Sequence, residues 1–170
     1  MRLCLFAMLL VLAAVFAQTP AGLGEGYVGE FDLAARQTLQ LAEATPAEKF
    51  VWRPAPGVRS IGEVHMHVAI GNYWLLSQAG VKLADAPKIA ADTEKKVIAK
   101  ADVIRWLKGS QDAVRAAYPK ADRQKQVKFF GKDAPAENVF LRILNHNHEH
   151  MGQSIAYARM NGIAPPWSKE

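Results

Sequence analysis

Apolar residues recur at helical spacing in four stretches of this chain, and breaks rich in proline and glycine separate them. The pattern predicts four helices, at residues 28–44, 60–79, 92 or 93–118, and 135–161. Ser60 and Glu63 have the spacing of a capping box at the start of the second helix. The loop after the second helix is long enough to cross the bundle, so the second and third helices can run parallel or antiparallel. With no convincing strand and no internal repeat, the sequence predicts an all-α fold, a four-helix bundle.

The first residues have the pattern of a secretory signal peptide. A positively charged start precedes an uninterrupted apolar run, residues 3–16, and Ala17 supplies a small residue at the cleavage point. An uncleaved membrane anchor is the alternative, but a spanning helix needs about 20 apolar residues and this run is shorter. We therefore expect residues 1–17 to be removed, with a cut near Ala21 as a variant. The protein is then exported, periplasmic or secreted, and the bundle domain occupies residues 28–170.

Composition excludes several kinds of function. The only cysteine, Cys4, lies in the predicted signal peptide, so the mature protein would have no disulfide, cysteine nucleophile or cysteine-ligated metal. The chain has 21 Lys and Arg against 16 Asp and Glu, a net charge of +5 at pH 7. The positive residues are mixed with acidic ones and form no basic run interleaved with aromatic residues. We therefore expect no nucleic-acid partner and, after signal cleavage, no membrane partner.

The five histidines fall in two clusters, each on a predicted helix. His146 and His150 are four residues apart, so they share one helix face and can chelate one ion, whereas His148 points away from them. A strand would align all three, but the apolar positions of this segment recur at helical spacing: Val139, Ile143 and Tyr157. Two imidazoles on adjacent turns can both reach an ion at about 2.0–2.1 Å. The spacing alone is weak evidence for a metal.

A third ligand would come from the second helix, where two histidines compete. His65 and His67 flank the apolar arc of this helix on either side, and periodicity does not choose between them. His67 shares its side with Gly71, which would leave open space beside a metal, and with Trp74, which could form the wall of a pocket. On this ground we prefer His67 modestly.

Several segments resemble the DinB (DinB/YfiT-like) family. Residues 59–69 (RSIGEVHMHVA) resemble its first motif, in which an R-S-x-G-E segment opens a helix and a ligand histidine follows. Residues 146–153 (HNHEHMGQ) and 157–166 (YARMNGIAPP) are similar to its closing patterns H-x-x-E-H-x-G-Q and Y-x-R-x-x-G-I-x-P-P. Residues 50–57 (FVWRPAPG) also look like the stretch before the first motif. The resemblance covers essentially everything after residue 27, and two motifs in the right order make it specific.

The resemblance implies a bundle with up-down-down-up topology and a metal held by His67, His146 and His150. His65 and His148 have no counterpart in the ligand motif, which implies surface or second-shell positions. The cofactor would be a divalent transition metal, with zinc as the default and nickel, iron and manganese left open. Three neutral imidazoles leave a coordination position for water or substrate, as in catalytic sites.

The expected function is therefore that of an exported metal-dependent enzyme, hydrolase-like, acting on a small molecule that the sequence does not identify. The alternatives are a bundle that binds a metal or ligand without turnover, a thiol-dependent transferase as in some relatives, and a bundle whose histidines meet no metal. The sequence also leaves a homodimer open and reveals no general base.

Four further residues are candidates for roles in the pocket: Asn72, Tyr73, Glu149 and Arg159. Each also has a structural interpretation, which we consider the better one. In particular, Tyr157 and Arg159 could tie the last helix to the tail at Pro165 and Pro166.

Overall fold

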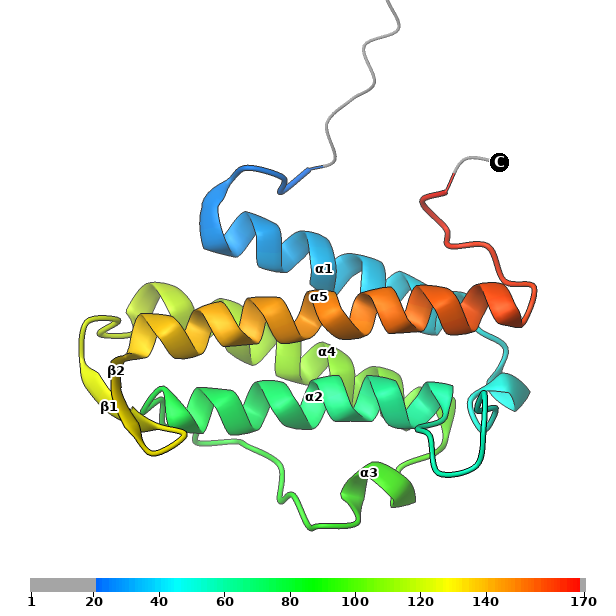
Figure 1. Cartoon of the computed structure of the whole chain (residues 1–170), viewed down its shortest axis with the longest axis horizontal. Coiled ribbons are helices and arrows are strands. Elements are labelled where there is room, and N and C mark those ends of the chain that lie inside the picture. The colour runs from blue at the N-terminus through cyan, green and yellow to red at the C-terminus, as the bar shows by residue number, and fades with distance from the viewer. Residues whose placement is uncertain (1–20, 169–170) are drawn as a thin grey trace, which may run out of the picture.

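The computed structural model describes residues 21–168, and the predicted signal peptide, residues 1–17, lies outside them. Four long helices lie side by side in this part of the chain (Figure 1): α1 (Gly26–Ala44), α2 (Ile61–Gln78), α4 (Lys100–Ala117) and α5 (Ala136–Met160). Short 3₁₀ turns follow α1 and α4, at Ala47–Lys49 and Tyr118–Lys120. Over the same residues, no helix combines the length and hydropathy of a membrane span.

Helices α2 and α4 run parallel, and both run antiparallel to α1 and α5. Val68 shares a core cluster with Val103, and Leu76 near the end of α2 shares one with Val114 near the end of α4. In contrast, Lys100 at the start of α4 donates a hydrogen bond to the carbonyl oxygen of Glu43 at the end of α1. The long helices therefore run up, down, down and up (Figure 1).

The predicted third helix is divided into two pieces. A short helix, α3 (Thr93–Lys96), is followed by Val97 in an extended conformation, and α4 begins only at Lys100. The β-branched Val97 and Ile98 favour this break over a continuous helix. A helix does begin at Thr93 as predicted, but the prediction that it continues without interruption to Tyr118 was wrong. The break turns α3 onto the outside of α2, with which it is in contact (Figure 1).

A β-hairpin precedes α5, so the prediction that the chain has no strand was also wrong. Strand β1 (Gln126–Phe129) pairs antiparallel with β2 (Lys132–Pro135) through a two-residue turn. Each strand has only four residues and lies at the surface. In β1 exposed and partly buried positions alternate, whereas β2 shows no alternation.

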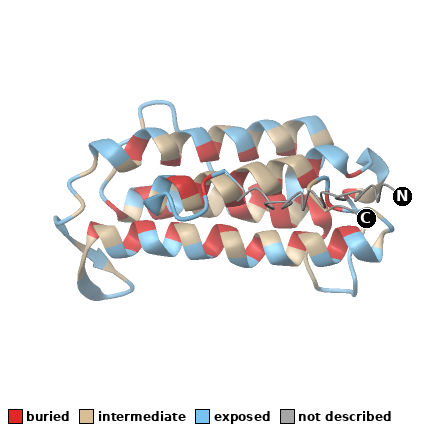
Figure 2. Ribbon diagram, turned by 90° about the horizontal axis from the view of Figure 1, so that it is seen from above, coloured by how far each residue is buried: buried red, intermediate tan, exposed pale blue. Residues whose placement is uncertain are grey.

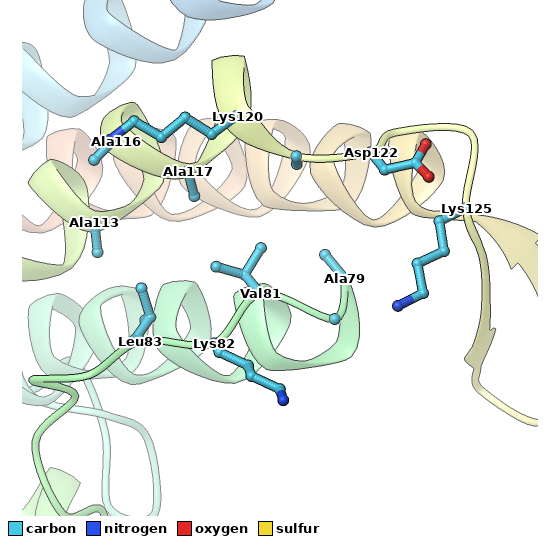
Figure 3. Close-up of a pocket in the computed structure, with 12 residues that line it drawn as sticks. Ala79, Val81, Lys82, Leu83, Ala113, Ala116, Ala117, Lys120, Asp122 and Lys125 are labelled. Carbon is cyan, nitrogen blue, oxygen red and sulfur yellow. The ribbon is translucent and has the colours of Figure 1, made fainter.

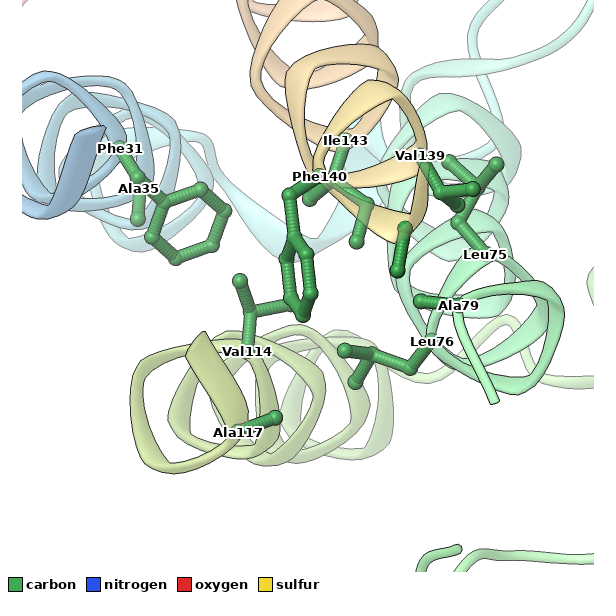
Figure 4. Packing of buried hydrophobic residues seen from close by; sticks show 11 residues of the cluster. Phe31, Ala35, Leu75, Leu76, Ala79, Val114, Ala117, Val139, Phe140 and Ile143 are labelled. Atoms are coloured by element: carbon green, nitrogen blue, oxygen red, sulfur yellow. The ribbon is translucent and has the colours of Figure 1, made fainter. Parts of the chain in front are cut away.

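The buried residues lie on the faces of the helices that meet inside the bundle (Figure 2). In the cluster nearest the hairpin, Phe140 points from α5 to the centre, where Phe31 and Val114 meet it (Figure 4). At the N-terminus of α2 the predicted capping box is confirmed: the Glu63 amide donates to Ser60 Oγ at 3.3 Å, and the Ser60 amide donates to Glu63 Oε2 at 2.6 Å. This cap fixes where α2 begins and hence the height of its histidines in the bundle.

Candidate metal centre

Three imidazoles converge between α2 and α5. One ligand nitrogen from each of His67, His146 and His150 lies within 4.8 Å of the other two. The ring centroids are 4.6 to 5.0 Å apart. His146 and His150 are buried and His67 is half-buried, so the cluster lies at the edge of the interior.

The spacing of the ring nitrogens suits a transition metal ion. Nε2 of His67 is 3.2 Å from Nε2 of His146. Metal–nitrogen bonds of about 2.0–2.1 Å at a tetrahedral angle place two ligand nitrogens about 3.3–3.4 Å apart. The pair is therefore close to the separation that a shared ion requires, and imidazole is a ligand that zinc and its neighbours prefer.

A carboxylate from α3 orients His67. Glu94 Oε2 lies 3.2 Å from Nδ1 of His67, and Glu94 Oε1 accepts a 2.6 Å hydrogen bond from Nε of Arg59. A carboxylate at Nδ1 favours the tautomer with hydrogen on Nδ1, which leaves Nε2 as the free ligand atom. Sequence reasoning missed Glu94, because a position 27 residues from His67 on a different helix has no periodic relation to it.

His150 is oriented from within its own helix. Its Nδ1 lies 2.8 Å from Oε1 of Gln153, and Nε2 of Gln153 donates to the Tyr157 hydroxyl at 3.0 Å. Tyr157 packs edge-on against Trp52, at a centroid distance of 5.5 Å. Tyr157 thus connects α5 to the loop before α2, and the tie to the C-terminal tail that the sequence suggested stays a prediction.

Close packing of the helix backbones fixes the third histidine. A Cβ atom at Gly71 would lie only 2.5 Å from Cε1 of His146, so this ring occupies the space that glycine leaves on α2. The expected open space beside Gly71 is therefore filled by a ligand ring. Nδ1 of His146 is buried and has no hydrogen-bond partner among residues 21–168.

The surroundings of His146 and His67 favour the neutral form of each imidazole. Burial, with the nearby His150 and His67, lowers the pKa of His146 to about 3. Burial also lowers the pKa of His67, assisted by Arg59 and His150 and opposed by Glu94. Neutral imidazole is the form that binds a metal ion, so both side chains are ready to do so at pH 7.

The other two histidines lie apart from this cluster. His65 is fully buried near the Phe50 ring, and neither of its ring nitrogens has a hydrogen-bond partner in the described chain. Burial lowers its pKa to about 4. The expectation of a surface or second-shell position is therefore wrong for His65. His148 is half-buried, with Nδ1 3.0 Å from the Leu144 carbonyl oxygen of its own helix.

The four residues considered for pocket roles do not contact the cluster through hydrogen bonds in the described part of the chain. Asn72 is buried inside the bundle, where its Oδ1 accepts a 2.7 Å hydrogen bond from Asn147. Tyr73 packs against Trp106 of α4. Glu149 and Arg159 are exposed on α5.

A separate cavity of about 500 Å³ lies between the C-terminal ends of α2 and α4 (Figure 3). Its apolar lining includes Val81 and Leu83, and Lys82, Lys120 and Lys125 surround it. These lysines follow the ends of helices, where a positive charge is favoured by the helix dipole. Their position therefore has a structural explanation, and the cavity is distinct from the histidine cluster.

The chain matches the family model described as the DinB superfamily over residues 30–154. This match spans most of the sequence, and the chain belongs to the DinB superfamily. No protein with a curated description is similar to it by sequence at a significant level.

Two solved structures share the fold. A DinB-like protein from Bacillus cereus is 20% identical, with a TM-score of 0.70 over 85% of this chain and 97% of the other. A DinB-like protein from Bacillus subtilis is 12% identical, with a TM-score of 0.60 over 85% of this chain and 99% of the other. At these identities the similarity establishes the arrangement of the helices and not the reaction.

Proposed function

We propose that this protein is an exported metal-dependent enzyme, hydrolase-like, in which His67, His146 and His150 hold one divalent ion, with zinc as the expected metal. The observation that carries the proposal is the convergence of three imidazoles from two helices. Membership of a metal-binding family is compatible with it. Among residues 21–168, no fourth His, Cys, Asp or Glu completes the group, as a catalytic site with an open position requires.

The chain's own residues would orient the ligands. Glu94 and Gln153 engage Nδ1 of His67 and His150, which leaves Nε2 of each ring for the ion. Such an ion, when bound, would supply Lewis acidity toward a carbonyl or phosphoryl oxygen and would acidify water. Both oxygens of Glu94 are engaged, by His67 and Arg59, so Glu94 acts as a positioning residue and not as a free base.

Metal analysis followed by an activity screen tests the proposal. Protein purified from the producing cells should contain about one metal ion per chain, and chelation should lower its melting temperature, because the folded state alone binds the ion. The metal-loaded protein should hydrolyse at least one member of a panel of ester, amide and phosphoester substrates. His150→Ala should remove both metal and turnover, whereas His148→Ala, on the same helix but outside the cluster, should keep both.

Other outcomes would favour the alternatives. One ion per chain with no turnover in any class would indicate a metal-binding protein without catalysis. Turnover only in the presence of a low-molecular-weight thiol would indicate a transferase, a function that fits poorly with export because such thiols are concentrated in the cytoplasm. N-terminal sequencing of the exported protein should find a start after Ala17, and an intact N-terminus would contradict cleavage.

A further inference from the structure

The face of α2 that carries His67 continues to Trp74. His67, Gly71 and Trp74 are spaced by four and three residues, so their side-chain directions fall within about 60° of one another. Gly71 already packs against the His146 ring. Trp74 lies only about 4.5 Å farther along the helix axis, and helical Cα–Cβ bonds tilt toward the N-terminus, here toward the histidines. Trp74 therefore lies on the same face of α2 as His67, nearer to the hairpin.

A second aromatic ring lies next to Trp74. Phe130, at the tip of the hairpin, has its ring centroid 5.8 Å from that of Trp74. The exposed fraction is 45% for Trp74 and 75% for Phe130. Two adjacent aromatic rings thus expose apolar surface that would be more stable covered, and contiguous surface of this kind often marks a binding site.

The backbone of the turn is also unfavourable for phenylalanine. Among residues 21–168, Phe130 is the only residue other than glycine with positive φ, at 48°, and Gly131 follows at 79°. This two-residue turn is of a kind that favours Asn-Gly, and a left-handed backbone is unfavourable for a residue with a side chain. Phenylalanine nevertheless occupies this position, and its apolar ring is exposed to solvent beside Trp74.

We propose that Trp74 and Phe130 form a platform that binds an aromatic group of the substrate, while the polar reacting group of the same molecule lies at the metal centre. This inference rests on the proposed function and names its substrate class: small molecules with an aryl group next to a hydrolysable, metal-binding group. Stacking against Trp74 provides the affinity nearest the ion, and Phe130 extends the contact for larger ring systems.

Hydroxamates separate the two parts of this site, because their two oxygens bind a metal ion whatever group they carry. Acetohydroxamate, benzohydroxamate and 2-naphthohydroxamate would be titrated calorimetrically into the zinc-loaded protein. We expect benzohydroxamate to bind about tenfold more tightly than acetohydroxamate, and 2-naphthohydroxamate more tightly still. In Trp74→Ala, benzohydroxamate and 2-naphthohydroxamate should each bind with an affinity within about twofold of that of acetohydroxamate. The affinity for acetohydroxamate itself should be unchanged.

Phe130→Asn provides a variant that does not endanger folding, because Asn-Gly suits the turn better than Phe-Gly. It should reduce the additional preference for 2-naphthohydroxamate. Met160→Ala removes an exposed apolar side chain at the C-terminal end of α5. It should leave the relative affinities for the three hydroxamates unchanged.

The possible failures are distinguishable. Equal binding of all three hydroxamates would overturn the aromatic platform and leave the open metal centre intact. If no hydroxamate binds to protein shown to contain zinc, the proposed function fails and the platform fails with it. If Trp74→Ala and Phe130→Asn convert a dimer to monomers without changing the relative affinities, the rings are a contact between copies of this chain, and the platform is wrong.

Discussion

The two helices of the metal centre hold their histidines in different ways. On α5, side-chain hydrogen bonds link His150 to Gln153 and Gln153 to Tyr157, residues that are three and four positions apart on one helix. On α2, His67 depends on Glu94, 27 residues away, which in turn is bound by Arg59 across 35 residues. The hydrogen bond that orients His150 can therefore form whenever α5 is helical, whereas the one that orients His67 forms only when the linker before α4 is in place.

The largest effect is expected where the two sides meet, at Gly71. Gly71→Ala would place a Cβ 2.5 Å from Cε1 of His146. Such overpacking costs about 1–3 kcal/mol of unfolding free energy. Displacement of the His146 ring should also weaken zinc binding by about 100-fold, the upper end of effects on ligand orientation. Chemical denaturation and competition with a chelator would measure the two quantities.

Gly152→Ala is the matched control for this substitution. A Cβ at Gly152 meets no atom within 4 Å among the described residues. Gly152→Ala should therefore raise the unfolding free energy by about 0.5–1 kcal/mol, because alanine has a higher helix propensity than glycine, and should leave the zinc affinity unchanged. Wild-type affinity in Gly71→Ala would show that His146 is not held against α2 in the manner described.

The next effect compares the two supports directly. Glu94→Ala should weaken zinc binding by about 10- to 100-fold, and Gln153→Ala by a factor near the lower end of this range. The difference is expected because hydrogen bonds that involve an ionised group are roughly twice as strong as neutral ones. Competition titrations would measure both constants.

Asp92→Ala serves as the control, because Asp92 precedes α3 and makes an exposed ion pair with Lys96. It should change the affinity little. Equal losses for Glu94→Ala and Gln153→Ala would remove the distinction between a long-range and a local support.

Acid should destabilise the metal-free protein through histidines of both helices. Burial lowers the pKa of His65 to about 4 and that of His146 to about 3, and the pKa of His67 is also lowered. In the unfolded chain these groups titrate near 6.5, so below that pH the unfolded state binds more protons. The unfolding free energy is therefore fully retained above about pH 6.5 and decreases as the pH falls toward 4. Urea unfolding at pH 7 and pH 5 would reveal the decrease, and equal stabilities would refute it.

The smallest effect concerns His65. Both of its ring nitrogens are buried without a hydrogen-bond partner among residues 21–168, which costs free energy that an apolar side chain of similar size would not. His65→Leu should raise the unfolding free energy by about 1 kcal/mol and make the acid dependence shallower. Thermal unfolding of the metal-free variant would test this, and a large destabilisation would mean that the ring has a partner.

The sequence predicts what depends on local periodicity. The four long helices, the capping box at Ser60 and the convergence of His146 with His150 all follow from spacing along single helices. His67 was preferred over His65 because it shares a side of its helix with Gly71 and Trp74, and the family resemblance then settled the choice. The structure places His67 with the other two rings.

Long-range features could not be predicted in this way. Glu94 reaches His67 because the chain breaks between α3 and α4. The contact joins residues on different helices, which periodicity along one helix cannot predict. His65 lies beside the apolar arc of α2, so its burial could not be predicted, yet the bundle encloses it. The hairpin was missed because only β1 alternates, and four residues are too few for an alternation to indicate a strand.

The linker between α2 and α4 limits where the length of this protein can change during evolution. Because those helices run parallel, the linker must span the length of the bundle, and it also delivers Glu94 to the height of His67. Insertions and deletions are usually tolerated in surface loops. Here insertions and deletions should be confined to residues 82–90. A change of length between Glu94 and Lys100 would move the Glu94 carboxylate out of hydrogen-bonding distance of His67. Natural relatives with the same cluster should accordingly vary in length before this short helix and keep the distance after it.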